Sequence, residues 1–156
     1  MGGCDTGKEG VDAGSKILIV GAGLTGCETA LKYLQDGKSV TMIDALPKEE
    51  LGLGSSPINA YYLFSLLEEN NVDLKPETKL VDVTEEYAVI EKDGKEEKLV
   101  FDTVILASGM RADANSEIIS RLKEKVAECY IAGDCSGSQG TLWNAVTSAF
   151  DAAMAI

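Results

Sequence analysis

Histidine is absent from this chain of 156 residues, and its four cysteines form no C-x-x-C pair. Zinc sites and dithiol redox centres need such residues at close, regular spacing. The sequence therefore supports neither a metal site nor a redox-active dithiol. Cys4, Cys27, Cys129 and Cys135 are expected to be free thiols, which is the usual state of cysteine in a reducing compartment.

Positive charge is scarce as well. The chain has 14 Lys and Arg residues against 26 Asp and Glu residues, a formal net charge of -12, and no basic cluster. Such a surface repels phosphate backbones and anionic membranes, so neither nucleic acid nor membrane is expected as a partner. No apolar run approaches the roughly 20 residues that span a bilayer. The start, "MGGCDTGKEGVDAGS", has no apolar signal-peptide core, so we expect a cytoplasmic location.

Residues 1–14 are rich in glycine among small and charged residues, and such a composition buries too little surface to order itself. We expect a flexible leader there. The remaining residues, 15–156, are expected to form a single dinucleotide-binding domain, because a chain of this length with 45% hydrophobic residues can bury one core of ordinary size.

The first half of this region alternates between strand and helix patterns. "KILIV", residues 16–20, is a short apolar run typical of a strand buried on both faces. A helical pattern follows over residues 24–36, then a strand at 39–44. Ser56-Pro57 introduces a second helix, and "VDLK", residues 72–75, is a third strand. This β-α-β-α-β order predicts an α/β, Rossmann-like, doubly wound parallel sheet.

Past Pro76 the pattern changes to three short strands, "KLVDV", "YAVIEK" and "EKLVF". Asp93-Gly94 separates the last two, and this pair is a strong hairpin signal because the glycine accepts positive φ. We therefore expect an inserted three-stranded antiparallel meander. The apolar run "DTVILASG" then predicts a further strand of the parallel sheet.

The last third of the chain predicts a helix from Ser116, a strand at "YIAG" and a terminal helix over residues 141–156. We expect "YIAG" to pair in parallel with "TVILA", because an isolated apolar strand would leave its backbone groups without partners. The terminal helix places apolar residues on one face that we expect to be buried. These are Leu142, Val146, Ala149, Phe150 and Ala153.

Gly21, Gly23 and Gly26 satisfy the G-x-G-x-x-G pattern between the first strand and the first helix. The pattern alone is weak, since glycines also cluster in purely structural turns, but the strand before it and the helix after it favour a dinucleotide site. Gly21 permits the tight turn, Gly23 leaves room for a pyrophosphate, and Gly26 lets the helix approach the strand. The phosphates would face free N–H groups at the positive end of the helix. The site therefore includes the rest of the turn, Ala22, Leu24 and Thr25.

Asp44 ends the second strand, close to the expected spacing of about 20 residues after the first glycine. A carboxylate there can accept both ribose hydroxyls of an adenosine and repels a 2′-phosphate, which favours NAD(H) over NADP(H). The alternative is a solvated strand-end aspartate. Lys48 nearby is a weaker hint that a phosphate could be tolerated.

Three ordered motifs carry a family resemblance: "VGAGLTGCETA", "FDTVILASGMRAD" and "YIAGDCSG". Residues 16–156 resemble the pyridine-nucleotide domain of the two-dinucleotide-binding flavoproteins. Within them, the chain most resembles the C-terminal region of NADH-dependent flavin oxidoreductases of the old-yellow-enzyme type, the 2-enoate and 2,4-dienoyl-CoA reductases.

This resemblance implies a role in passing hydride from NADH to a flavin, with the chemistry residing in the cofactors. The three glycines would hold the pyrophosphate and Asp44 the adenosine ribose. Glu28 would lie toward the nicotinamide half, although it could equally be a helix-surface carboxylate. Ser108 and Gly109 would let the backbone pass close to the dinucleotide. Asp134 would hold the ribityl chain of a flavin such as FAD, unless it is only a turn aspartate. We assign no catalytic residue.

The sequence also departs from the family. It has no flavin-type G-x-G-x-x-G ahead of the one at residues 21–26, no barrel and no cysteine cluster for iron–sulfur ligation. Ala112 and Asp113 stand where the family tends to have Pro and Asn. The chain thus looks like an excised region whose residues 110–156 resemble the return segment to a flavin domain. Its partners would be the flavin and barrel domains of a parent enzyme.

Two other functions compete with this hypothesis. The chain could be a non-catalytic, stand-alone dinucleotide-binding module that acts as a sensor or scaffold of NAD or FAD, although such a module has no obvious use for Asp134. It could also be a methyltransferase-like Rossmann domain, which Asp44 fits but the meander and the "ASG" and "AGD" motifs do not.

Overall fold

The computed structural model describes residues 13–52, 57–109, 116–136 and 140–156. The chain divides into two compact units, residues 1–109 and residues 110–156, and each unit is described by itself. In the described ranges, no helix is long and apolar enough to cross a bilayer.

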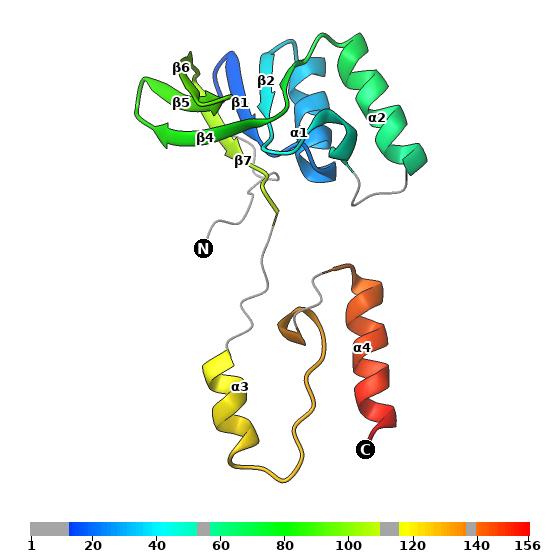
Figure 1. Ribbon diagram of the computed structural model, residues 1–156. Helices are drawn as coiled ribbons and strands as arrows, with labels where there is room; N and C mark the ends of the chain where they lie inside the picture. The colour runs from blue at the N-terminus through cyan, green and yellow to red at the C-terminus, as the bar shows by residue number, and fades with distance from the viewer. Residues whose placement is uncertain (1–12, 53–56, 110–115, 137–139) are drawn as a thin grey trace. The chain divides into compact units, whose positions relative to one another are not determined.

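The first unit is built on a four-stranded parallel sheet with the strand order β3-β2-β1-β7 (Figure 1). Its strands are β1 (Lys16–Val20), β2 (Ser39–Ile43), β3 (Asp73–Lys75) and β7 (Thr103–Leu106). Its two α-helices are α1 (Leu24–Gln35) and α2 (Pro57–Glu69), each connecting two of the parallel strands. The predicted α/β, doubly wound, Rossmann-like sheet is confirmed.

The central strand β1 is buried on both faces, as its continuous apolar pattern predicts. Ile17 and Ile19 point into a core shared with α1 and α2. Leu18 and Val20, on the alternate face, pack in a second core with residues of the meander. The sheet is therefore sandwiched between a helical layer and a β layer.

The meander is a separate three-stranded antiparallel sheet of β4 (Thr78–Val83), β5 (Tyr87–Lys92) and β6 (Lys95–Val100). Asp93 and Gly94 have φ of 53° and 71°, which is the left-handed backbone of a tight two-residue hairpin. The pairing of β4 with β5 shifts by one residue between Leu80 and Asp82. The predicted inserted meander is thus confirmed.

Asp102 ties the start of β1 to the start of β7. Its Oδ2 accepts hydrogen bonds from the backbone N–H groups of Ser15, at 2.6 Å, and Lys16, at 2.8 Å. Thr103 Oγ1 donates to the carbonyl of Ala13, which is buried. Residues 13 and 14, expected to belong to the leader, are therefore packed against the sheet.

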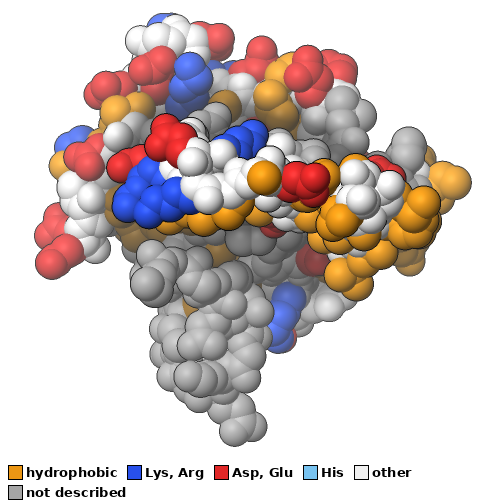
Figure 2. Space-filling model, turned by 90° about the horizontal axis from the view of Figure 1, so that it is seen from below, with side chains coloured by type: hydrophobic (Ala, Val, Ile, Leu, Met, Phe, Trp, Pro, Cys, Tyr) orange, Lys and Arg blue, Asp and Glu red, His pale blue; other side chains and the backbone are white. Residues whose placement is uncertain are grey.

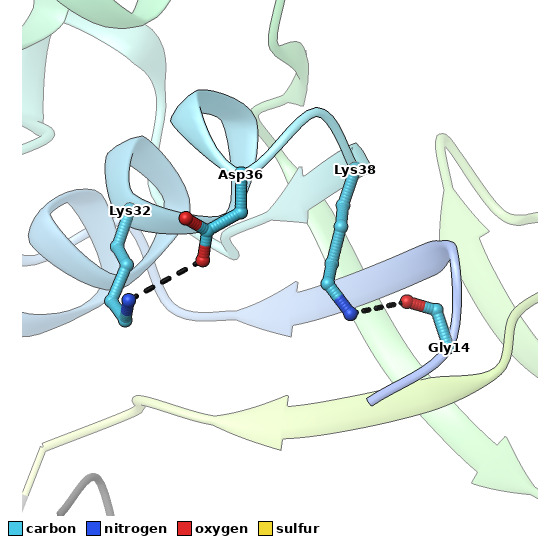
Figure 3. A network of polar contacts seen from close by, with 4 residues as sticks. All are labelled: Gly14, Lys32, Asp36 and Lys38. Atoms are coloured by element: carbon cyan, nitrogen blue, oxygen red, sulfur yellow. Dashed lines mark hydrogen bonds and ion pairs between the residues drawn. The ribbon is translucent and has the colours of Figure 1, made fainter. Parts of the chain in front are cut away.

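Lys38 completes these contacts from the end of the loop between α1 and β2. Its Nζ donates to the carbonyl of Gly14 at 2.5 Å (Figure 3). The same ammonium lies 5.7 Å from the centre of the Tyr33 ring. Residues 1–12 of the expected leader lie outside the described residues.

The second unit contains α3 (Ser116–Lys123), the short 3₁₀ helix η2 (Asp134–Ser136) and α4 (Leu142–Met154). The prediction that "YIAG" forms a strand beside β7 is wrong, because residues 130–133 form no strand and β7 pairs only with β1 in the described sheet. These residues bond to α4 instead. Gly133 N–H donates to Ser148 Oγ at 2.9 Å, and the Tyr130 hydroxyl donates to the Ala155 carbonyl at 3.0 Å.

The expected burial of the apolar face of α4 is also not seen in the described part of this unit. Leu142, Val146 and Phe150 are exposed by 82%, 58% and 63%. Hydrophobic side chains are visible at the surface in Figure 2. The helix begins regularly all the same, since the Thr141 hydroxyl accepts a hydrogen bond from the N–H of Asn144.

The Asp102 contacts predict a pH-dependent contribution to stability. The hydrogen bonds from Lys16 and Ser15 lower the pKa of Asp102. A carboxyl whose pKa is lower in the folded than in the unfolded protein stabilises the folded state. This contribution is complete at pH values above the unfolded pKa of about 3.9, and it is lost as the pH falls through the folded pKa. We expect Asp102→Asn to lower the urea midpoint at pH 7, with the difference from wild type shrinking below about pH 4.

Asp93→Asn is the matched control, because asparagine accepts the positive φ of that hairpin residue. It removes the same charge without touching β1, so its urea midpoint should stay near that of wild type. Equal midpoints for Asp102→Asn and Asp93→Asn at pH 7 would contradict the assignment.

Candidate functional site

The turn between β1 and α1 is held against the end of β7. Gly21 N–H donates to the Ile43 carbonyl at 2.8 Å, and Gly21 has a φ of 112°. A Cβ at Gly21 would lie 2.4 Å from the carbonyl oxygen of Ala107. Backbone conformation and space both require glycine at this position.

Gly26 allows the first turn of α1 to rest directly on the strand end. A Cβ there would lie 2.0 Å from the Gly21 carbonyl oxygen and 3.4 Å from the Ala107 Cβ. Gly26 is buried within α1. The packing of strand, turn and helix therefore accounts for both Gly21 and Gly26.

Gly23 is different, because nothing in the fold requires a glycine at this position. Its φ of -73° and ψ of -179° suit any residue, and among the described residues no atom beyond its two chain neighbours lies within 4 Å of where a Cβ would be. The missing side chain leaves open space at the start of α1. Open space of this kind leaves room for a ligand to approach the backbone.

The start of α1 offers hydrogen-bond donors to that space. No side chain caps the helix at Gly23. The backbone N–H groups of Leu24, Thr25 and Gly26 have no hydrogen-bond partner among the described residues. These N–H groups and the helix dipole together favour an anion. The geometry fits the pyrophosphate of a dinucleotide.

Asp44 follows β2, next to this turn, as its spacing predicts. One carboxylate oxygen accepts from Ala22 N–H at 2.7 Å and the other from Leu46 N–H at 2.9 Å. Sequence reasoning missed this second role, in which Asp44 fastens the turn. Each oxygen keeps a lone pair that can accept a further hydrogen bond, for example from a ribose hydroxyl.

The segment after β7 borders the turn as well. The position of a Cβ on Gly21 is 3.0 Å from Ser108 N. Gly109 has a φ of 85°, and no atom of the described residues, its chain neighbours aside, lies within 4 Å of where its Cβ would be. The structure thus brings Ser108 and Gly109 to the same edge as the glycine-rich turn. The sequence analysis did not identify Ala107 as the residue whose backbone lies against Gly21. The small residues of "LASG" were the feature that could have indicated this close approach.

Glu28 is exposed on α1, one turn after Leu24. Cys27 beside it is buried and donates through its thiol to the Ala22 carbonyl at 3.4 Å. Burial, with smaller contributions from the carboxylates of Asp44 and Glu28, raises the pKa of Cys27 to about 12. Cys27 is therefore an inert thiol.

Asp134 belongs to the second unit, so it is described with that unit alone. It is exposed at the start of η2, after Gly133 with its φ of 76°. Cys129 and Cys135 are free thiols, as expected for them and for Cys27. Ala112 and Asp113 lie outside the described residues, and those that are described contain no group of side chains able to hold a metal ion.

The parallel sheet and the glycine-rich turn at its carboxyl edge define a nucleotide-binding α/β protein of the doubly wound kind. The family described as pyridine nucleotide-disulphide oxidoreductase matches residues 4–152. The chain belongs to this family of redox enzymes, which confirms the resemblance seen in its three motifs.

Among curated relatives, cinnamate reductase of Clostridium sporogenes is 29% identical over 151 residues, covering 96% of this chain and 22% of the relative. NADH oxidase of Thermoanaerobacter brockii is 24% identical, covering 96% of this chain and 23% of the relative. The chain thus spans less than a quarter of the length of either relative.

Solved structures show the same fold. A 2-naphthoyl-CoA reductase has a TM-score of 0.70 at 22% identity, covering 94% of this chain and 22% of that one. Histamine dehydrogenase from Rhizobium has a TM-score of 0.69 at 13% identity, covering 90% and 23%.

The different environments of the three glycines predict different effects on stability. Gly21→Ala and Gly26→Ala each force a Cβ into backbone atoms, so each should destabilise the protein by about 1–3 kcal/mol. Gly23→Ser adds a side chain in open space at a helix N-cap, where serine is favoured, and should leave stability unchanged or slightly raised. Urea unfolding of the three variants checks this order. A Gly23→Ser variant as unstable as Gly21→Ala would show that the fold itself needs Gly23.

Proposed function

We propose that this chain binds NAD(H) at the β1–α1 turn and positions it for hydride transfer to a flavin within a larger NADH-dependent oxidoreductase of the enoate or dienoyl-CoA reductase kind. The observation that carries the proposal is the open space at Gly23, between two glycines that the packing itself requires. When bound, NADH supplies the hydride. The chain supplies binding and orientation.

The pyrophosphate lies over the turn formed by residues 21–26. The backbone N–H groups of Leu24, Thr25 and Gly26 donate to it, and the positive end of α1 stabilises its charge. Ala22 contributes through its own N–H, whose bond to Asp44 keeps the turn in its binding conformation. Such preorganisation lowers the entropic cost of binding.

Asp44 accepts hydrogen bonds from the adenosine ribose. The N–H groups of Ala22 and Leu46 hold its carboxylate at the end of β2, so both oxygens are oriented before the ligand arrives. A 2′-phosphate in place of the 2′-hydroxyl would bring a dianion against this carboxylate and remove a donor from it. The proposal therefore specifies NADH rather than NADPH.

The nicotinamide half continues along the carboxyl edge of the sheet, where Ser108 and Gly109 follow β7. The positive φ of Gly109, a conformation that favours glycine, suits a close passage of backbone and ligand. Glu28 lies one turn into α1 and faces this half. We propose no catalytic residue, because hydride transfer requires this chain to position the nicotinamide and exclude water, and not to transfer a proton.

Asp134 is the proposed contact to the ribityl chain of the flavin, which could be FAD. Its turn is fixed from α4 by the bond of Gly133 N–H to Ser148 Oγ. The flavin and barrel domains of a parent enzyme would be its partners. Support comes from the relatives, whose length this chain covers only in part.

The role of Asp44 predicts a cofactor preference. Loss of charge-assisted hydrogen bonds of about 1.5–3 kcal/mol corresponds to an NADH affinity about tenfold to a hundredfold above that for NADPH. Isothermal titration calorimetry of the purified chain with each nucleotide measures this ratio. Equal affinities, or tighter binding of NADPH, would remove Asp44 from the proposed role.

A second prediction separates the site from the fold at Gly23. Aspartate is a favourable helix N-cap residue, but its carboxylate would occupy the pyrophosphate position. We expect Gly23→Asp to keep the melting temperature and to abolish NADH binding in the same titration. Gln35→Glu adds the same charge at the other end of α1 and should bind NADH as wild type does. Retained binding by a folded Gly23→Asp variant would refute the pyrophosphate assignment.

A further inference from the structure

We propose that Glu68 enforces the preference for NADH by holding Lys48 away from the adenosine ribose. This inference rests on the proposed function and extends it to a residue outside the dinucleotide turn. Lys48 is the only basic residue between Asp44 and α2. A cation in this stretch is the group that would attract the 2′-phosphate of NADPH, because it follows the strand that ends at the ribose.

In the structure, the Lys48 ammonium is engaged elsewhere. Lys48 begins the 3₁₀ helix η1 (Lys48–Glu50), and its Nζ lies 3.1 Å from Glu68 Oε1. The segment after η1 packs on α2, since a Cβ on Gly52 would lie 3.0 Å from the Phe64 ring. Phe64 and Glu68 are four residues apart and share a face of α2. The packing of Gly52 against Phe64 therefore also brings Glu68 close to Lys48.

The direction of α2 sets where the ion pair points. β3 follows α2 and is parallel to β2, so α2 must lead the chain from the carboxyl edge of the sheet back to its amino edge (Figure 1). Glu68 lies in the last turn of this helix. The pair consequently draws the ammonium toward the amino edge, whereas Asp44 and the proposed ribose position lie at the carboxyl edge.

The neighbouring strand repeats this arrangement. Lys75 ends β3 beside Ile43, and its Nζ lies 3.6 Å from Asp73 Oδ2. Lys75, like Lys48, thus has a carboxylate partner. Asp44 repels a 2′-phosphate directly, and Glu68 holds back the positive charge of Lys48, which could compensate for that repulsion.

The size of the effect follows from exposure. The side chains of Lys48 and Glu68 are 63% and 64% exposed, and exposed pairs of this kind contribute little. Releasing Lys48 should therefore tighten NADPH binding by about two- to fivefold, while NADH binding stays unchanged. The gain should fade as salt is added, because screening weakens exposed charges.

The test compares NADH and NADPH affinities, by calorimetry at low salt, for wild type, Glu68→Gln, Lys48→Gln and the double variant. Glu68→Gln should tighten NADPH binding alone, and the double variant should lose that gain. Lys48→Gln alone should leave both affinities unchanged.

Asp36→Asn is the matched control for charge. It also converts an acid to its amide and releases an exposed lysine, because Asp36 Oδ2 lies 3.3 Å from Lys32 Nζ at the far end of α1 (Figure 3). It should not change the ratio of the two affinities.

Equal NADPH affinities for Glu68→Gln and Asp36→Asn, with NADH still bound, would overturn the role of Glu68. Weaker NADPH binding by Lys48→Gln would overturn it too, since Lys48 would then already serve the phosphate. A wild-type chain that binds neither nucleotide would instead refute the proposed function.

Discussion

The contact between the backbone of Gly21 and the backbone of Ala107 governs the geometry of the first unit. It joins the end of β1 to the end of β7, at a distance that no side chain on Gly21 could tolerate. Gly26 then brings α1 down onto the same point. Strand, turn, helix and neighbouring strand therefore meet within a few atoms of Gly21, and the open space at Gly23 lies beside this contact.

The turn therefore divides its tasks between residues that look alike in sequence. Gly21 and Gly26 are required by the packing, whereas Gly23 lies in open space, where we propose that the pyrophosphate binds. Asp44 has a structural role, since its carboxylate accepts from Ala22 N–H, and a proposed role in binding ribose. A substitution of Asp44 would consequently disturb the shape of the turn along with the proposed ribose contact, whereas a substitution of Glu68 leaves the turn intact. Substitutions in the Lys48–Glu68 ion pair therefore test nucleotide preference without changing the turn.

Local patterns predicted most of the first unit, because its elements depend on periodicity and turn chemistry. The continuous run of β1, the hairpin at Asp93-Gly94 and the glycine spacing are features of this kind. The segment "YIAG" was predicted wrongly, since its backbone donor at Gly133 finds Ser148, and no local signal announces that partner. The pair of Lys48 and Glu68 was equally invisible, because it depends on how Gly52 seats against α2.

The central position of β1 also bears on how the sheet assembles. Ile17 pairs with Val40 on one side and with Thr103 on the other, so one neighbour is near in sequence and the other is far. Closing the longer loop costs more chain entropy than closing either hairpin of the meander. The β5–β6 hairpin, closed by Asp93 and Gly94, is local by comparison. The pairing of β1 with β7 thus contributes contacts of large sequence separation, and the glycine-rich turn forms at the end of the same two strands.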